Sequence, residues 1–261
     1  MQGFQLMSQP STSHRPNIII IGATSAMAEQ CARIWVSRQA CNLLLIGRNT
    51  EALSSIKADL QVRSPESVID VQMSAMEYAE EIQALTEQAL TDRQPDTVLI
   101  AHGTLPDQQQ CQDDIKQAEQ AVRINGLSPV LLAEAFIKQM LENNKGTLAV
   151  IGSVAGDRGR KSNYVYGAAK GLVTRYLEGL QHRLAGSHVS VVIIKPGPTD
   201  TPMTAHLKAA GQKMATSQAV AADIVSAIDH KKPVCYTPGK WALIMLVIRN
   251  LPRFIFNKMD I

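Results

Sequence analysis

Tyr166 and Lys170 have the side chains and the spacing to move a proton. They stand four positions apart in the run SNYVYGAAK at residues 162–170, so in a helix both side chains leave the same face. A phenol has an ordinary pKa of about 10, and a nearby cation lowers that pKa because it favours the phenolate. The pair could therefore give a proton to a carbonyl or take one from an alcohol. Tyr164 has Ala168 four positions later and offers no such pair.

Short apolar runs alternate with helical patterns from residue 17 onward, and these elements must position the pair. The strands are expected at 17–21, 42–46, 67–73, 97–101, 146–151 and 188–194. The helices are expected at 26–38, 51–62, 77–90, 114–138 and 162–184. Such alternation is typical of a parallel sheet with helices on both faces. We therefore predict an α/β fold with a doubly wound parallel sheet (a Rossmann fold), as a single domain over residues 17–238.

Composition and charge argue against nucleic-acid and metal binding. The net charge of +3 is small, and no Lys/Arg run carries interleaved aromatic residues. The four cysteines form no Cys-x-x-Cys pair, so we expect no metal site, no disulfide framework and a reducing compartment. Residues 1–16 lack the basic and apolar regions of a signal peptide and are expected to form a flexible tail. No stretch reaches the 18 or so apolar residues of a spanning helix, so the sequence predicts a cytoplasmic protein.

The first expected strand runs into a turn at residues 22–28 (GATSAMA) that could bind the pyrophosphate of a dinucleotide. A glycine makes the tight turn, hydroxyls reach phosphate oxygens, and amides at the start of the next helix face the phosphates. Alanines at 26 and 28 replace the glycines that allow the closest backbone approach, which makes this a loosened version of the site. An ordinary strand-to-helix turn is the alternative. The expected binding residues are Gly22, Thr24, Ser25, Ala26 and Met27.

The end of the second expected strand favours NADPH over NADH. A carboxylate there would bind the adenosine ribose and repel a 2′-phosphate, but Gly47 offers none. Arg48 follows with a guanidinium suited to phosphate, and Asn49 stands beside it. A solvated surface arginine is the alternative. After the third strand, Ser74 stands where a carboxylate could meet the adenine, so that contact is expected to be weaker or to come from Met73 and the backbone.

Three more polar features are expected at the same edge of the sheet. Ser153 follows the fifth expected strand, Asn125 lies in the helix before it, and residues 195–201 (KPGPTDT) follow the sixth. In an open α/β sheet, ligands bind at the carboxyl ends of the strands, so these loops and the turn at 22–28 belong to one crevice. The loop after Ser153 is long enough to bring its hydroxyl beside the phenol of Tyr166.

Together these residues resemble the classical short-chain dehydrogenase/reductase family over residues 17–235. The resemblance implies that Tyr166 donates the proton to a substrate carbonyl while NADPH delivers hydride. It implies that Lys170 lowers the pKa of the tyrosine and binds the nicotinamide ribose. Ser153 would orient and polarise the carbonyl, and Asn125 would hold a water that links Lys170 to solvent. These four are the expected catalytic residues, and a dimer or tetramer is also implied.

The same resemblance implies cofactor contacts beyond the first turn. They are Ala101, His102, Gly103, Tyr166, Lys170, Pro196, Gly197, Thr199 and Thr201. The family's usual Asn-Ala-Gly after the fourth strand reads Ala-His-Gly here, which removes a side-chain amide that steadies the sheet. His102 is therefore expected to be a structural substitute or a cofactor contact rather than a catalyst.

The C-terminal region, residues 239–261, should decide selectivity together with a lid at 202–218. Residues 241–248 (WALIMLVI) are apolar, and basic and aromatic residues follow them. The stretch is too short to span a bilayer, but it suits an interfacial helix in peripheral membrane contact. The alternative is a helix packed on the substrate pocket or at a subunit interface. This tail resembles the subgroup that includes the decaprenylphosphoryl keto-pentose reductase, whose substrate is a polyprenyl-phosphate sugar.

Three functions stay open on the sequence alone. The first is an NADPH-dependent reductase of a keto group on a lipid-linked or other sugar in envelope polysaccharide synthesis. The second is a reductase of an acyl or other hydrophobic carbonyl, with the apolar C-terminus as a pocket wall. The third is a non-catalytic nucleotide-binding regulator, against which Asn125, Ser153, Tyr166 and Lys170 count. The partner is expected to be a small-molecule or lipid-linked carbonyl compound, and not a nucleic acid.

Overall fold

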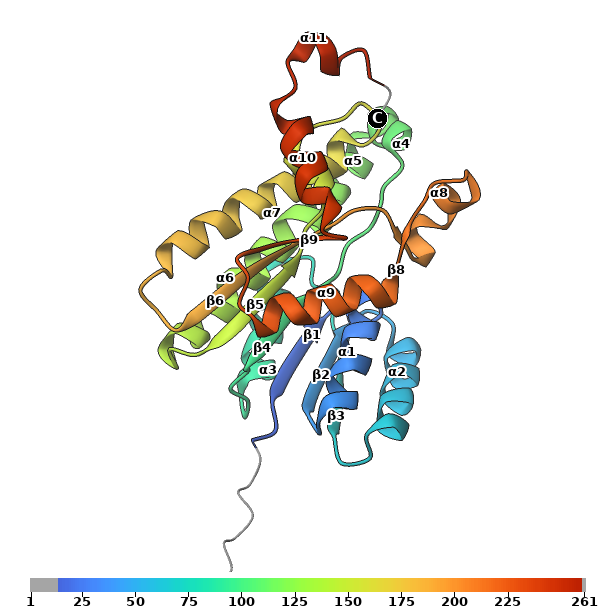
Figure 1. The fold of residues 1–261 in the computed structure, drawn as a ribbon. Coiled ribbons are helices and arrows are strands. Elements are labelled where there is room, and N and C mark those ends of the chain that lie inside the picture. Colours follow the sequence, from blue (N-terminus) through green and yellow to red (C-terminus); the bar gives the residue numbers. More distant parts are fainter. Residues whose placement is uncertain (1–13, 260–261) are drawn as a thin grey trace, which may run out of the picture.

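The structure is a computed structural model that describes residues 14–259. Within them, seven parallel strands form the central sheet in the order β3-β2-β1-β4-β5-β6-β9 (Figure 1). The strands are β1 (Asn17–Ile21), β2 (Asn42–Gly47), β3 (Val68–Met73), β4 (Thr97–Ile100), β5 (Gly146–Ile151), β6 (Val189–Pro196) and β9 (Val234–Thr237). The predicted single-domain Rossmann fold is confirmed. The flexible tail predicted at 1–16 falls almost wholly outside the described residues.

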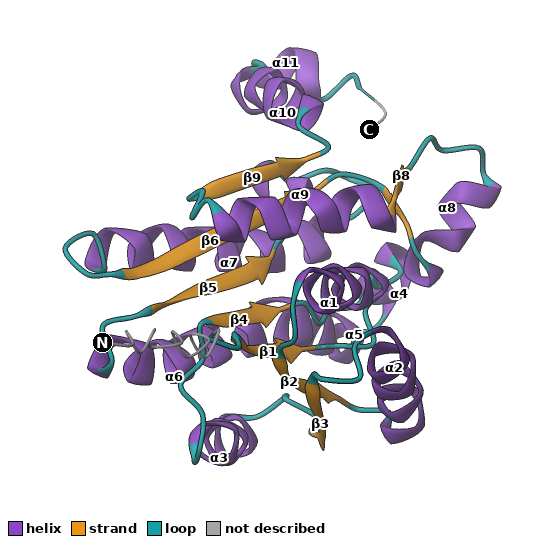
Figure 2. Cartoon of the chain, turned by 60° about the horizontal axis from the view of Figure 1, so that its bottom comes forward, coloured by secondary structure: helices purple, strands orange, loops and turns teal. Residues whose placement is uncertain are grey.

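Both faces of the sheet are covered, as Figure 2 shows. Ile18 and Ile20 of β1 belong to the core cluster on the face that carries α1 (Ala26–Arg38), α2 (Thr50–Arg63) and α9 (Ser217–Asp229). Ile19 and Ile21 belong to the cluster on the opposite face, with α3 (Ala79–Leu90), α6 (Ser128–Glu142) and α7 (Tyr164–Arg183). Successive strand side chains point to opposite faces, so the unbroken isoleucine run fills two cores at once.

The strand β9 at the edge of the sheet was not expected from the sequence. It pairs in parallel with β6, with Ile194 opposite Cys235. Its four residues lie between Pro233 and Pro238. Two prolines that close together read as a loop, and only the pairing with β6 identifies the strand.

The helices expected at 114–138 form an interrupted stretch in the structure. Short α4 (Gln108–Asp113) leads into α5 (Ile115–Val122), a π-helical segment follows at Arg123–Leu127, and α6 continues to Glu142. A π-helical segment leaves the regular hydrogen-bond ladder and often marks a functional site. Asn125 lies in its middle and is fully buried.

The remaining elements gather beyond the carboxyl ends of the strands. The 3-10 turn Val154–Asp157 follows β5. The lid region expected at 202–218 contains the turn Pro202–Thr204, α8 (Ala205–Ala209) and β8 (Ala215–Thr216), which pairs with β7 (Thr199–Asp200). The C-terminal region forms α10 (Lys240–Asn250) and α11 (Arg253–Phe256), which stand beyond the end of β9 in Figure 1. Among residues 14–259, no helix is long and apolar enough to cross a membrane.

Candidate active site and cofactor cleft

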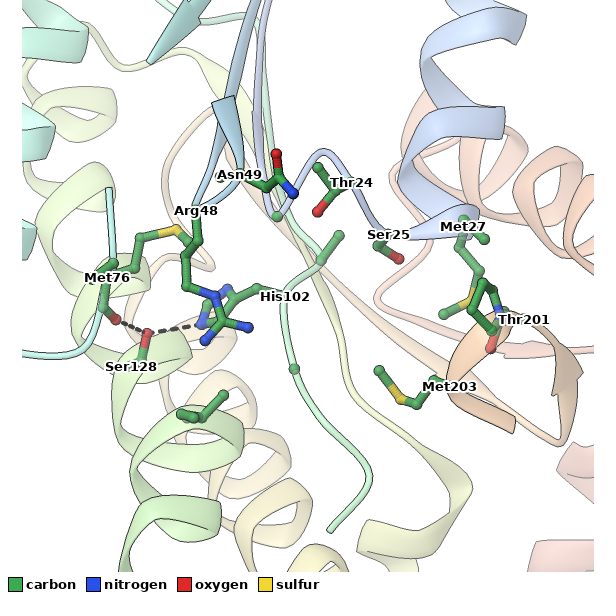
Figure 3. Close-up of a pocket in the computed structure, with 18 of the residues that line it drawn as sticks. Thr24, Ser25, Met27, Arg48, Asn49, Met76, His102, Ser128, Thr201 and Met203 are labelled. Carbon is green, nitrogen blue, oxygen red and sulfur yellow. Dashed lines mark hydrogen bonds between the residues drawn. The ribbon is translucent and has the colours of Figure 1, made fainter. Parts of the chain in front are cut away.

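A cleft of about 420 Å³ opens at the carboxyl ends of the central strands. Figure 3 shows Thr24, Ser25 and Met27 on one side of it and His102 with Ser128 on the other. Its lining includes most of the predicted cofactor residues, namely Gly22, Thr24, Ser25, Ala26, Met27, Arg48, Asn49, Ala101, His102, Gly103 and Thr201. Loops from both halves of the sheet therefore meet in one crevice. Their individual contacts with a cofactor stay predictions.

The turn after β1 needs glycine at residue 22 for two reasons. Its φ is +77°, and a Cβ there would lie 2.5 Å from the backbone nitrogen of His102. The amides of Gly22 and Ala23 donate to the carbonyl of Ile46 at 2.8 and 3.0 Å, which fixes the turn to β2. Ser25 then begins α1 without a side-chain cap, so amides of the first turn remain able to bind an anion. This cradle fits the pyrophosphate of a dinucleotide.

Arg48 stands at the mouth of the cleft, with 57% of its side chain exposed. Its Nη1 lies 3.8 Å from Oε1 of Glu77, which is a loose contact that a phosphate could replace. Asn49 also lines the cleft, but its Oδ1 accepts a hydrogen bond at 2.9 Å from the Ala52 amide. That oxygen caps α2, so only the Nδ2 amino group of Asn49 remains able to bind a cofactor.

The wall after β3 differs from the expectation. Ala75, Met76 and Glu77 line the cleft, whereas Ser74 and Met73 do not. Met76 has a φ of 60°, so the backbone turns back toward the sheet and buries the Met76 side chain. Met73 remains 68% exposed. Sequence spacing could not reveal this reversal, because a non-glycine residue rarely adopts a positive φ.

His102 is held in one tautomer by a short chain of hydrogen bonds. Ser128 Oγ donates to the carbonyl of Met76 and lies 2.8 Å from His102 Nε2 (Figure 3). Since the serine proton is used, His102 Nε2 must be the donor. The Nδ1 atom is then an unprotonated acceptor, and it is buried without a partner among the described residues. Burial, with the positive charges of Lys170 and Arg48, lowers the pKa of His102 to about 3.

The predicted Tyr166–Lys170 pair lies on the first two turns of α7. The Lys170 side chain is buried, and its Nζ lies 5.9 Å from the centre of the Tyr166 ring. That Nζ donates to the carbonyl of Ile151 at 3.1 Å. Burial lowers the pKa of Lys170 to about 8. Among the described residues the Lys170 ammonium has no carboxylate partner. With a pKa of about 8, it loses its proton at a lower pH than an ordinary lysine does.

Ser153 lies near Tyr166 and affects its pKa. Burial raises the pKa of Tyr166 above its ordinary value, and the Ser153 hydroxyl opposes only part of that rise. The expectation of a lowered tyrosine pKa is therefore not met in this structure. The close approach of the two elements requires Gly167, because a Cβ there would lie 2.9 Å from the carbonyl oxygen of Ala155. Ser153 also accepts a hydrogen bond from the Ala155 amide at 3.1 Å. The Ala155 amide thereby ties the serine hydroxyl to the turn after β5.

The Asn125 side chain is fully engaged with protein groups. Its Oδ1 accepts from the Thr104 amide at 2.9 Å, and its Nδ2 donates to the Ala121 carbonyl at 2.9 Å. It thus ties the loop after β4 to the π-helical segment. A Cβ on Gly103 would lie 2.9 Å from Asn125 Oδ1 and 3.5 Å from Lys170 Nζ. Gly103 therefore lines the cofactor cleft and also lies next to Asn125 and Lys170.

The remaining predicted residues lie beside the cleft and do not line it. Tyr166, Lys170, Pro196, Gly197 and Thr199 are absent from its wall. Gly197 packs against the indole of Trp241 and donates to the Thr237 carbonyl at 2.9 Å. Thr199 is buried, and its hydroxyl donates to the Gly197 carbonyl at 3.0 Å. The loop after β6 reaches the cleft through Thr201 instead.

A second buried cluster was not predicted. It lies close to the loop between β5 and α7 (residues 152–163), which carries Ser153 and is called the catalytic loop below. Lys195 Nζ lies 2.6 Å from Asp157 Oδ1, and both side chains are at most 4% exposed. Tyr236 donates to the other carboxylate oxygen at 2.7 Å. Burial and this hydrogen bond raise the pKa of Tyr236 to about 12. The carboxylate fixes both partners, so this cluster joins the loop after β5 to β6 and β9.

The family follows from comparison with known proteins. The family model described as short chain dehydrogenase matches residues 16–212, which is most of the chain. The chain belongs to the short-chain dehydrogenase family. The predicted membership is confirmed, and with it an NAD(P)-dependent oxidoreductase. The narrower subgroup stays a prediction.

Relatives of this short-chain dehydrogenase include an uncharacterized oxidoreductase of Mycobacterium tuberculosis, 29% identical over 93% of this chain and 96% of its own. An uncharacterized oxidoreductase of Streptomyces coelicolor is 28% identical over 93% of this chain and 95% of its own. Among solved structures, a short-chain dehydrogenase from Sphingobium yanoikuyae in complex with NADPH gives a TM-score of 0.81 at 19% identity, covering 94% and 96% of the two chains. Levodione reductase gives 0.79 at 20% identity, covering 87% and 98%. At these sequence identities the two structures show that the fold is shared, and nothing beyond the fold.

Several residues of the site carry no signal that the sequence could have provided. Ser128, Met76 and Glu77 line the cleft, yet each stands in an ordinary helical or loop context. Ser128 is recognisable only once His102 is seen to face it. Thr104 likewise becomes notable only through its contact with Asn125. These residues act through partners that are distant in the sequence.

Proposed function

We propose that the protein is an NADPH-dependent reductase that converts a keto group to a hydroxyl group. The observation that carries the proposal is the buried Lys170 one turn after Tyr166 on α7, with the Ser153 hydroxyl near enough to that phenol to act on its pKa. NADPH supplies the hydride when it is bound. The residues suited to hold its pyrophosphate are Gly22, Thr24, Ser25, Ala26 and Met27. Neighbours of this fold with NADPH bound support the choice of a nicotinamide cofactor.

The chain's own residues would handle the proton. Ser153 donates a hydrogen bond to the substrate carbonyl oxygen and orients it. Tyr166 gives its hydroxyl proton to that oxygen as negative charge develops on it. The ammonium of Lys170 stabilises the phenolate that remains. The side chain of Asn125 is occupied, so the water that returns a proton toward Lys170 would be held by backbone oxygen freed in the π-helical segment.

His102 would contact the cofactor and not the substrate. Its Nδ1 is a buried acceptor at the cleft, and a buried acceptor without a partner costs free energy. A hydroxyl or amino group of the cofactor could donate to it. A His102→Phe variant should then weaken cofactor binding while the pH dependence of turnover stays unchanged.

Arg48 would select NADPH by binding its 2′-phosphate. A hydrogen bond to a charged group contributes about 1.5–3 kcal/mol, so Arg48→Ala should raise the KM for NADPH roughly 10- to 100-fold and leave that for NADH nearly unchanged. The matched control is Arg175→Ala, an exposed arginine of α7 that contacts only Glu178 among the described partners. Equal losses for both cofactors would contradict the assignment of Arg48.

The substrate we propose is a keto group on a lipid-linked or other sugar, as expected in envelope polysaccharide synthesis. The apolar, basic C-terminal helices and the resemblance of the tail support this choice. A reductase of an acyl or other hydrophobic carbonyl is the second candidate, because Trp241 and Met245 of α10 pack beside the catalytic loop and could form a pocket wall. Either reaction would take place in the cytoplasm, with peripheral membrane contact in the first case.

The decisive test is a screen of keto-sugars and acyl carbonyls with NADPH oxidation as the readout. Turnover that is lost in Tyr166→Phe would support the reductase, and the preferred substrate would separate the two candidates. If no carbonyl compound oxidises NADPH, and Tyr166→Phe leaves the phenotype of the cell unchanged, the protein is a non-catalytic nucleotide-binding regulator. Light scattering on the same sample tests the dimer or tetramer that we propose from the family.

A further inference from the structure

The C-terminal arm, residues 240–258 with α10 and α11, is seated by one narrow face on the loop after β6 and on the catalytic loop. Trp241 stands against Gly197, where a Cβ would lie 1.9 Å from the indole nitrogen. One turn later, Met245 is fully buried, and its sulfur lies 3.5 Å from Nη2 of Arg160. These residues recur at helical spacing, so only one stripe of α10 is covered.

Arg158 holds the arm in this position. Its guanidinium donates to the carbonyls of Ile248 and Leu251, the latter at 2.7 Å, and lies 3.8 Å from the centre of the Phe256 ring. Carbonyls at the end of a helix have no intrahelical partner, and here one arginine binds them. Because Arg158 directly follows the turn that Ser153 begins, the arm and the catalytic loop form one unit.

The opposite face of the arm is apolar and exposed. Leu243, Leu246 and Val247 are 67%, 58% and 54% exposed, and Phe254 of α11 is 70% exposed. A helix that is apolar on all sides is expected to be buried on all sides. Contiguous exposed apolar patches mark interaction sites. The folded chain covers α10 on one side, so something else is needed on the other.

The charge of the arm indicates what covers it. Between residues 240 and 259 the charged side chains are Lys240, Arg249, Arg253 and Lys258, with no acidic residue, and all four are exposed. A second copy of the arm would bring like charges together, which is unfavourable. An anionic lipid surface offers both an apolar layer for the leucine face and phosphate groups for the basic residues.

We propose that the C-terminal arm docks on an anionic membrane surface, with Leu243, Leu246, Val247 and Phe254 in the interfacial layer. The arm lies in the plane of the membrane and does not span it. Since Arg158 ties it to the loop of Ser153, docking brings the catalytic loop to the lipid surface. Membrane binding itself is independent of the proposed reductase function.

Flotation of the full-length protein with lipid vesicles tests this proposal. The protein should float with vesicles that contain phosphatidylglycerol and stay in solution with pure phosphatidylcholine. Leu246→Glu combined with Val247→Glu should reduce the partition coefficient onto these vesicles at least tenfold. Arg253→Glu should reduce it by about 25-fold, since each basic residue contributes about 1 kcal/mol at an anionic surface, or roughly fivefold, and the variant reverses that charge.

The matched controls lie on other surfaces. Val62 is 83% exposed on α2, and Val62→Glu should float as the wild type does. Lys138 is exposed on α6, and Lys138→Glu should also have no effect. Turnover of a small water-soluble ketone should be unchanged in the arm variants, so loss of flotation and loss of the proposed activity are separate results.

Two outcomes would overturn the proposal. One is wild-type protein that does not float with the anionic vesicles. The other is protein whose mass in light scattering falls by half in the Leu246→Glu, Val247→Glu variant, while flotation is equal for the wild type and the variant. The second result would assign the apolar face to a contact between copies of the chain.

Discussion

The molecule contains two clusters in which a buried lysine lies beside a half-buried tyrosine, and they use these residue types differently. Lys170 lies 5.9 Å from the ring centre of Tyr166, and Lys195 lies 5.4 Å from that of Tyr236. The second cluster includes the carboxylate of Asp157, which contacts both partners. In the first cluster the neutral hydroxyl of Ser153 lies near Tyr166, and Lys170 donates to the Ile151 carbonyl.

The two clusters differ in how firmly the tyrosine hydroxyl holds its proton. Asp157 accepts a hydrogen bond from the Tyr236 hydroxyl. Burial and this carboxylate raise the pKa of that phenol to about 12, so the proton stays on the tyrosine. Burial also raises the pKa of Tyr166, but there the Ser153 hydroxyl acts against the rise, while burial lowers the pKa of Lys170 to about 8. We therefore expect the pair that meets a carboxylate to be structural and the pair without one to be able to transfer a proton.

The largest expected effect is on turnover. Tyr166→Phe removes the proton donor while keeping the ring, so kcat should fall about 1,000-fold, within the range of general acid catalysis. Tyr236→Phe should leave kcat within about threefold, because its hydroxyl serves packing and hydrogen bonding. Both are measured as NADPH oxidation with a carbonyl substrate, and circular dichroism checks the fold. A similar loss of kcat in the two variants would contradict the assignment of Tyr166 as proton donor and of Tyr236 as a structural residue.

The next effect is on stability. Lys195→Met leaves the buried Asp157 carboxylate without its cation, which should lower the free energy of unfolding by about 3–5 kcal/mol. Lys170→Met leaves no such carboxylate and should cost much less stability, although turnover should collapse. Urea unfolding compares the two variants at one pH. If Lys170→Met proves the more destabilising of the two, Lys170 is structural as well.

The smallest expected effect is a pH dependence of stability that belongs to Lys170. Its pKa is about 8 in the folded protein and 10.5 when unperturbed, so between these values the unfolded chain binds more protons. Stability contributed by this group must therefore rise as pH increases from about 8 to about 10. Below pH 8 both states are protonated and the contribution is constant. Above about 10 the raised pKa of Tyr166 acts in the opposite direction.

The measurement is the difference in unfolding free energy between wild type and Lys170→Met at several pH values. That difference should shift in favour of the wild type as the pH rises through this window, by at most about 1.4 kcal/mol per unit. A flat difference would mean that Lys170 titrates near its ordinary value. The contrast with Lys195 would then rest on geometry alone.

Much of the fold was predictable because its signals are local. The isoleucine run of β1 and the leucine run of β2 were predicted within one residue, since buried parallel strands are apolar on both faces. Strand β9 was missed because its four residues carry no such signal. The π-helical segment was missed because Arg123–Leu127 continues the helical pattern of its neighbours.

The candidate site divides in the same way. Residues joined by a short spacing or a recognisable turn could be proposed from the sequence, including Tyr166, Lys170, Ser153 and Gly22. Residues whose importance lies in a distant partner were missed. Asp157 and Lys195 are 38 positions apart, and His102 meets Ser128 across 26. No local pattern encodes such a contact.

The sequence by itself determined the alternation that builds the sheet, the turn at Gly22, and the shared helix face of Tyr166 and Lys170, because each depends on neighbours within a few positions. Only the tertiary structure decided which buried lysine meets a carboxylate, which nitrogen of His102 is left as an acceptor, and which face of α10 remains uncovered. These properties arise where separate elements pack together. The free energy of a buried charge or an exposed apolar face depends on the atoms that surround it there.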